Sequence, residues 1–111
     1  MKDPYELTEE GGTFRLKLSG RLTYNDHNEM RKLIQFFKEN KTKKVVIDMS
    51  ELTFIDSSGI GILLIMAEEL RNFDGNMTIE NPTGQVARVL SVARIVELFL
   101  DPQTPIERIT S

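Results

Sequence analysis

Cysteine is absent from this 111-residue chain, and so are long hydrophobic runs. Without thiols the protein has no disulfide bonds and no thiolate metal site, which is compatible with a reducing compartment. The longest apolar stretch, residues 60–67, is much shorter than the ~20 residues that a membrane-spanning helix needs. The first five residues contain no apolar signal core. We therefore expect a cytoplasmic protein with no membrane insertion.

The chain also lacks a basic face. Its 14 basic and 17 acidic residues give a net charge of −3, and the lysines gather only at residues 38–44. Binding of nucleic acid requires a basic surface, so we expect no nucleic acid partner. A chain of this length forms one domain, residues 1–111, and buries a core without help from disulfides or metal.

The centre of the sequence predicts a strand followed by a helix. Val45, Val46 and Ile47 are β-branched and apolar, which is typical of a strand covered on both faces. Residues 50–54 are interpreted as a short connection. The apolar run at residues 60–67 belongs to a helix predicted over residues 57–72.

The flanking segments predict an α/β fold. Residues 5–12 and 13–19 are expected to pair as an antiparallel hairpin, with Gly20 ending the second strand. Asp26, followed by Glu29, predicts the start of a helix that ends near residue 40. Residues 77–80 predict another strand. The last helix is expected to follow a cap at Thr83. The apolar positions of these two helices are Met30, Leu33, Ile34 and Phe37, and then Val86, Val89, Leu90 and Ala93.

A strand, a helix and a second strand in this order imply a crossover between parallel strands. Because the loops at the carboxyl ends of parallel strands share one edge of the sheet, residues 23–27 should lie near residues 56–59.

The helix over residues 57–72 has two apolar lines. Ile60, Leu63, Leu64, Ala67 and Leu70 form one, and Ile62, Met66 and Phe73 form the other. The second line either packs against a neighbouring helix of the same domain or contributes to a surface that binds a partner.

Polar residues mark the junction between the central strand and its helix. Asp56, Ser57 and Ser58 fit helix capping, because a helix start leaves backbone N–H groups free. Gly59 and Gly61 do not fit it, since each costs about 0.5–1 kcal/mol inside a helix. We interpret them as places where another group approaches the backbone closely.

The motif Asp56-Ser57-Ser58-Gly59-Ile60-Gly61, after Leu52-x-Phe54-Ile55 and the strand Val45-Val46-Ile47-Asp48, resembles the signature of the STAS-domain anti-sigma-factor antagonists. The resemblance extends from about Phe14 to about Leu100 and includes Gly20-Arg21-Leu22. It implies a single STAS domain, with a mixed four- to five-stranded sheet and helices packed mainly on one face. The family's closing helix is expected to be shortened or absent, because residues 101–105 contain two prolines.

The resemblance also implies a function. In the family, the serine directly after the aspartate, here Ser57, is phosphorylated by a partner Ser/Thr kinase that is itself the anti-sigma factor. A metal-dependent phosphatase restores it. The protein is then a non-enzymatic switch without a cofactor. The predicted partner-binding residues are Thr23, Tyr24, Asp56, Ser58, Gly59, Ile60, Gly61, Ile62 and Met66. Thr23 departs from the acidic residue that is common at this position in the family.

Other classes of function remain open. The same STAS fold can serve as an interaction or ligand-sensing module in a signalling or transporter complex without a sigma factor. A serine hydrolase requires a base, and the chain has only His27; Asp56 also replaces the first glycine of a nucleophile elbow. A receiver domain would use Asp48 or Asp56, but the acidic pair near the first strand is missing.

Overall fold

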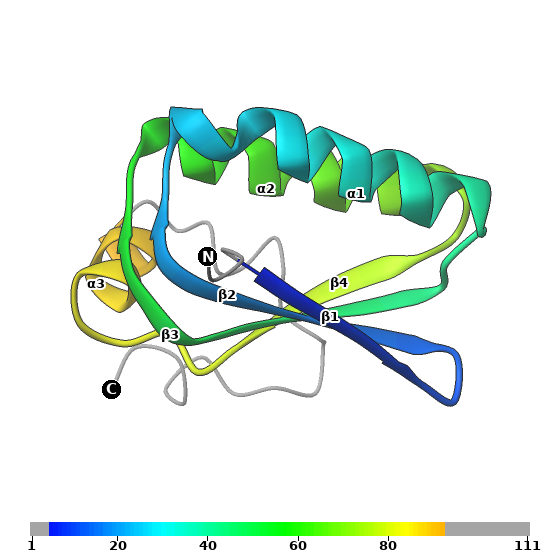
Figure 1. The fold of residues 1–111 in the computed structure, drawn as a ribbon, viewed down its shortest axis with the longest axis horizontal. Helices are drawn as coiled ribbons and strands as arrows, with labels where there is room; N and C mark the ends of the chain where they lie inside the picture. The colour runs from blue at the N-terminus through cyan, green and yellow to red at the C-terminus, as the bar shows by residue number, and fades with distance from the viewer. Residues whose placement is uncertain (1–4, 93–111) are drawn as a thin grey trace.

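The computed structural model of the protein describes residues 5–92 and shows an α/β arrangement (Figure 1). Within these residues, no helix is long and apolar enough to cross a membrane. The elements in chain order are β1 (Tyr5–Glu10), β2 (Thr13–Leu22), the 3-10 turn η1 (Tyr24–Asp26), α1 (His27–Glu39), β3 (Lys44–Ile55), α2 (Ser57–Asn72), β4 (Asn76–Glu80) and α3 (Gly84–Val92).

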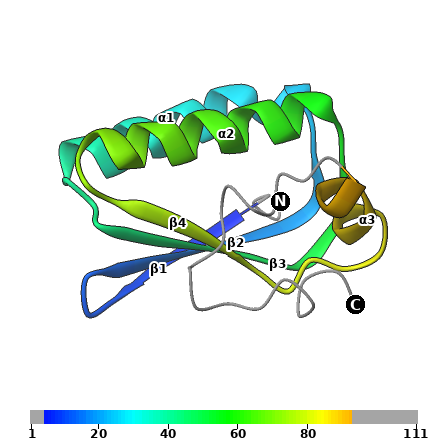
Figure 2. The ribbon, with the colours of Figure 1, turned by 180° about the vertical axis from the view of Figure 1, so that it is seen from behind.

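The four strands form one mixed sheet in the order β1-β2-β3-β4. β1 pairs with β2 in the antiparallel direction, whereas β2, β3 and β4 are parallel to one another. α1 and α2 lie side by side over one face of the sheet, and α3 lies beside the curved end of β3 (Figures 1 and 2). The predicted fold class, with a mixed sheet and helices mainly on one face, is confirmed.

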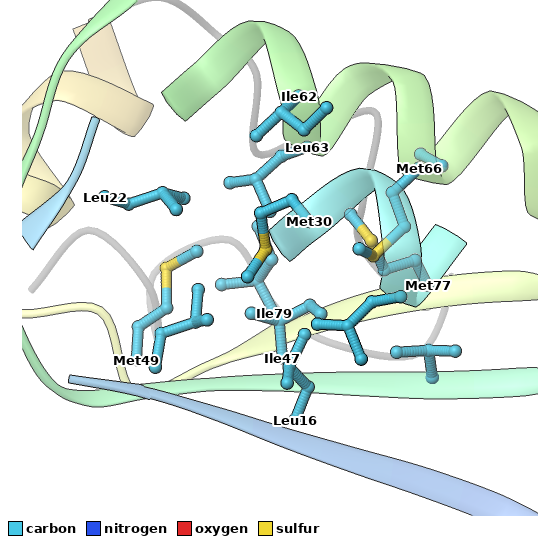
Figure 3. Packing of buried hydrophobic residues seen from close by; sticks show 14 of the residues in the cluster. Leu16, Leu22, Met30, Ile47, Met49, Ile62, Leu63, Met66, Met77 and Ile79 are labelled. Carbon is cyan, nitrogen blue, oxygen red and sulfur yellow. The ribbon is translucent and has the colours of Figure 1, made fainter. Parts of the chain in front are cut away.

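The core lies between the sheet and the two long helices. Figure 3 shows Leu16, Ile47 and Ile79, from three neighbouring strands, beneath side chains of α1 and α2. Burying one such side chain contributes roughly 1.5–3 kcal/mol, so this layer holds the helices on the sheet. The apolar face that the sequence predicted for α1 is confirmed: Met30, Leu33, Ile34 and Phe37 are all buried.

Two predicted strand ends are wrong. β3 does not stop before residue 50 but continues to Ile55, because β2 also runs further and pairs with it as far as Leu22. Gly20 does not end β2. It has a φ of +74°, a conformation that suits glycine, and it lies at an irregularity in the pairing of β2 with β3. The strand therefore bends there and continues to Leu22, beside Ile55 at the end of β3.

α1 begins at His27, directly after Asp26, as predicted, but the capping at this start differs from the prediction. The capping box is formed one turn earlier, where the Thr23 N–H donates to the Asp26 carboxylate at 2.9 Å. In return, the Thr23 hydroxyl accepts from the Asn25 N–H at 3.4 Å. Asp26 makes no side-chain cap for α1 itself. The residues after β2 thus form a fixed 3-10 turn instead of an open loop.

α3 begins at Gly84, directly after the predicted cap Thr83, whose carbonyl accepts a hydrogen bond from the Ala87 N–H. Val86 and Leu90 are buried, as their helical spacing predicted. The predicted packing of Ala93 and the shortened closing helix concern residues outside the described range.

An ion-pair network lies on the sheet face opposite α1 and α2. Arg15 contacts the carboxylates of Asp48 at 3.6 Å and Glu80 at 2.6 Å. Burial raises the pKa of Asp48, but hydrogen bonds from Ser50 and Asn81 and the charge of Arg15 outweigh it. The pKa of Asp48 therefore lies below its ordinary value. The network joins β2, β3 and β4 through one buried carboxylate.

Candidate functional site at the start of α2

The junction of β3 and α2 is a capped helix start. The Asp56 carboxylate accepts a hydrogen bond from the Gly59 N–H at 2.8 Å, and the Asp56 carbonyl accepts one from the Ile60 N–H at 3.0 Å. The carboxylate thereby satisfies one of the N–H groups that a helix start leaves free, and the bond from the Ile60 N–H is the first one within the helix. The predicted capping role of Asp56 is confirmed, and α2 has the predicted bounds.

Ser57 is the first residue of α2 and is exposed, whereas Ser58 is half-buried. The position of Ser57 beside the cap places its hydroxyl at the positively polarised end of the helix. A phosphoryl group on this oxygen would lie where backbone N–H groups favour negative charge. The site therefore offers an exposed serine at a helix start, where the helix dipole favours negative charge.

The turn after β2 lies beside this helix start, as the parallel crossover predicted. Leu22 pairs with Ile55, and the Leu22 carbonyl accepts a hydrogen bond from the Asp56 N–H at 3.3 Å. η1 contacts α2. Tyr24 is 73% exposed, and its ring stacks on the His27 ring at 5.9 Å between centroids. Thr23 is half-buried, and its backbone N–H and hydroxyl are both used in the capping box.

The two glycines of the motif have different causes. A Cβ on Gly59 would lie 2.5 Å from the Leu22 carbonyl oxygen and 2.8 Å from Cγ1 of Ile55. The group that approaches Gly59 closely is thus the end of β2 in the same chain. A Cβ on Gly61 would meet nothing within 4 Å among the described residues. Gly61 leaves the surface of α2 open near Ser57, and no contact within the described part of the chain requires a glycine there.

Ile62 and Met66 were predicted to bind a partner, and the structure contradicts this. Each is 1% exposed. Both belong to the core cluster, and α1, which shares that core, packs against α2 (Figure 3). The intramolecular alternative for the second apolar line is therefore confirmed, because α1 is the neighbouring helix. Ile60, two residues closer to the cap than Ile62, is half-buried and therefore partly accessible.

Sequence reasoning missed one residue at this junction. The Gln85 side chain on α3 bonds to both backbone groups of Ile55, the residue before the Asp56 cap. The two residues are thirty positions apart, and helical periodicity identifies only the apolar neighbour, Val86. No local pattern in the sequence indicates this contact.

The mixed sheet, the two helices on one face and the exposed serine at a capped helix start define an α/β domain that presents a small polar surface at one sheet edge. The chain belongs to the STAS domain family, whose domain matches residues 5–108.

The chain is also similar to known proteins in sequence and in fold. An anti-sigma F factor antagonist of Paenibacillus polymyxa is 22% identical over 95 residues, covering 85% of this chain and 81% of the relative. The anti-sigma factor antagonist SpoIIAA of Bacillus, solved in unphosphorylated and phosphorylated forms, gives TM-scores of 0.68 and 0.70 at 21% and 22% identity. Those alignments cover 95% of this chain and 94% and 96% of the SpoIIAA chains.

A sulfate transporter family protein of Wolinella succinogenes gives a TM-score of 0.72 at 14% identity, covering 91% of this chain and 78% of that one. At these levels of identity, the structural likeness establishes the fold alone.

Proposed function

We propose that this protein is an anti-sigma-factor antagonist that is switched by phosphorylation of Ser57. The unmodified form binds a Ser/Thr kinase of the anti-sigma type, and the phosphorylated form releases it. The observation that carries the proposal is the exposed serine at the first residue of α2, Ser57, next to the Asp56 cap. The similar proteins SpoIIAA and the Paenibacillus relative are named as anti-sigma factor antagonists, and SpoIIAA was solved with and without phosphate.

Electrostatics favour a switch that acts at the interface. Phosphorylation adds about −1.5 to −2 charges at pH 7. At a helix N-terminus this charge is stabilising by about 0.3–1 kcal/mol, so the helix should not melt. A bound partner would instead face a phosphate beside the Asp56 carboxylate. Desolvation and like-charge repulsion there would weaken the complex.

The docking surface extends on both sides of Ser57. On one side is Tyr24, displayed by the capping box of the turn after β2. On the other are Ser58, Ile60 and the open position at Gly61, where a partner can approach the helix backbone. Ile62 and Met66 support this surface from beneath and do not belong to it.

The partners follow from this mechanism. The kinase brings its own ATP and Mg²⁺, and a metal-dependent phosphatase restores the serine, so this protein needs no cofactor and performs no catalysis. Exchange between these partners would take place in the cytoplasm.

A second function is favoured by the likeness to a sulfate transporter family protein. In that case the domain serves as an interaction or ligand-sensing module of a transporter or signalling complex, without a sigma factor. Co-purification of a membrane transporter, in place of a kinase, would support it.

A pull-down from extract of the native organism, followed by mass spectrometry, tests the proposal. Wild type and Ser57→Ala should retain a Ser/Thr kinase, and Ser57→Asp should lose it. Thr8→Ala and Thr8→Asp provide matched controls at an exposed position of β1 and should both retain it. Phosphoserine should be found at residue 57. Equal kinase recovery with Ser57→Ala and Ser57→Asp would refute the switch.

A further inference from the structure

Among residues 5–92, the last part of β3 has a neighbouring strand on only one side. Pairing with β4 ends at Asp48 and Glu80, whereas β2 continues to pair with β3 as far as Ile55. Among the described residues, no strand pairs with β3 beyond Asp48 on the β4 side. A buried backbone N–H or C=O group without a hydrogen-bond partner costs free energy. On this side of β3, a group other than a strand therefore has to supply the hydrogen bonds.

Gln85 supplies that group. Its Oε1 accepts a hydrogen bond from the Ile55 N–H at 3.1 Å, and its Nε2 donates to the Ile55 carbonyl at 3.0 Å. One side-chain amide thus takes both bonds that a neighbouring parallel strand would make. On the other side of the same turn, the Asp56 N–H donates to the Leu22 carbonyl. The turn into α2 is therefore held from both sides.

α3 is well placed to hold this turn. Its residues Val86 and Leu90 are fully buried, which anchors the helix beside the end of β3 (Figure 2). Asn81, just before α3, donates to the buried Asp48 carboxylate at 3.3 Å. The segment that carries Gln85 is thus fixed to β3 at two places, Asp48 and Ile55.

We propose that Gln85 is a positioning residue for Ser57: its side-chain amide replaces a neighbouring strand beside Ile55 and fixes the turn from which Ser57 is presented to the kinase. Ile55 and Ser57 are separated only by the Asp56 cap, so loosening Ile55 changes the angle at which the serine hydroxyl enters an active site. Phosphoryl transfer depends steeply on such alignment. This role rests on the proposed function of Ser57.

The variant Gln85→Met tests it, because methionine preserves the length of the side chain and the helix while removing both hydrogen bonds. Hydrogen exchange of the Ile55 amide, followed by NMR, should become about tenfold faster. Arg88→Met, at an exposed position of the same helix, should leave that rate unchanged. Gln85→Glu keeps the acceptor and loses the donor. The exchange rate of its Ile55 amide should therefore fall between the rates in Gln85→Met and Arg88→Met. An unchanged exchange rate in Gln85→Met would overturn the proposal.

The functional measurement uses the kinase that wild-type protein captures, with Mg²⁺ and ATP. The maximal rate of Ser57 phosphorylation should fall at least about threefold in Gln85→Met, at a temperature where both proteins are folded, and should stay unchanged in Arg88→Met. Equal maximal rates for Gln85→Met and wild type would overturn the positioning role while leaving the Ser57 switch intact. If wild-type Ser57 is not phosphorylated at all, the proposed function itself fails.

Discussion

Alanine at Gly59 and alanine at Gly61 should change the stability of the protein in opposite directions. Both glycines lie in the first two turns of α2, where alanine is favoured over glycine by about 0.5–1 kcal/mol. At Gly61 the added methyl group meets nothing within 4 Å among the described residues. We therefore expect Gly61→Ala to raise the free energy of unfolding by about 0.5–1 kcal/mol.

At Gly59 the same methyl group has no room. Its Cβ would lie 2.5 Å from the Leu22 carbonyl oxygen, which also accepts the hydrogen bond from the Asp56 N–H. Overpacking of this kind costs about 1–3 kcal/mol, which exceeds the gain in helix propensity. Gly59→Ala should be destabilised by about 1–2 kcal/mol relative to wild type.

Urea unfolding followed by circular dichroism measures both changes as shifts of the midpoint at constant slope. Gly61 is also part of the proposed docking surface. Gly61→Ala should therefore bind the kinase less tightly, although it folds more stably. A Gly59→Ala variant as stable as Gly61→Ala would refute the assignment of Gly59 to an internal contact. Undiminished kinase binding by Gly61→Ala would remove Gly61 from the docking surface.

Three further outcomes are expected. Asp56→Ala should lower the free energy of unfolding by about 1 kcal/mol, measured by urea titration, because it removes the acceptor for the Gly59 N–H. Phosphorylation of Ser57 should leave the Tm unchanged or raise it in a calorimetric scan, and a marked fall in Tm would contradict a switch that acts only at the interface. Because the pKa of Asp48 is lowered in the folded state, its stabilising contribution is present above its unfolded pKa and is lost as the pH falls through its folded value. Asp48→Asn should therefore weaken the loss of stability as the pH falls below the ordinary pKa of Asp, about 3.9, and an unchanged pH profile would contradict this.

Strong local periodicity made the helices predictable from the sequence. α2 begins at Ser57, because Asp56 is a good cap before an apolar run, and the buried face of α1 follows from four apolar residues at helical spacing. The closeness of the turn after β2 to the start of α2 also followed from the sequence, since parallel crossovers bring such loops to one edge.

The remaining features depend on contacts that local sequence does not encode. Residues 50–54 are rich in polar side chains, so their continuation as a strand was visible only once β2 was found to pair with them. The second apolar line of α2 gave no indication of whether a helix or a partner covers Ile62 and Met66. Gln85 is an ordinary polar residue in a helix until α3 is placed beside Ile55.

Isothermal titration calorimetry of the captured kinase against unmodified and Ser57-phosphorylated protein tests the central claim most directly. The account predicts that phosphorylation raises the Kd at least tenfold, which corresponds to about 1.4 kcal/mol, while both forms stay folded. Equal Kd values for the two forms would contradict it.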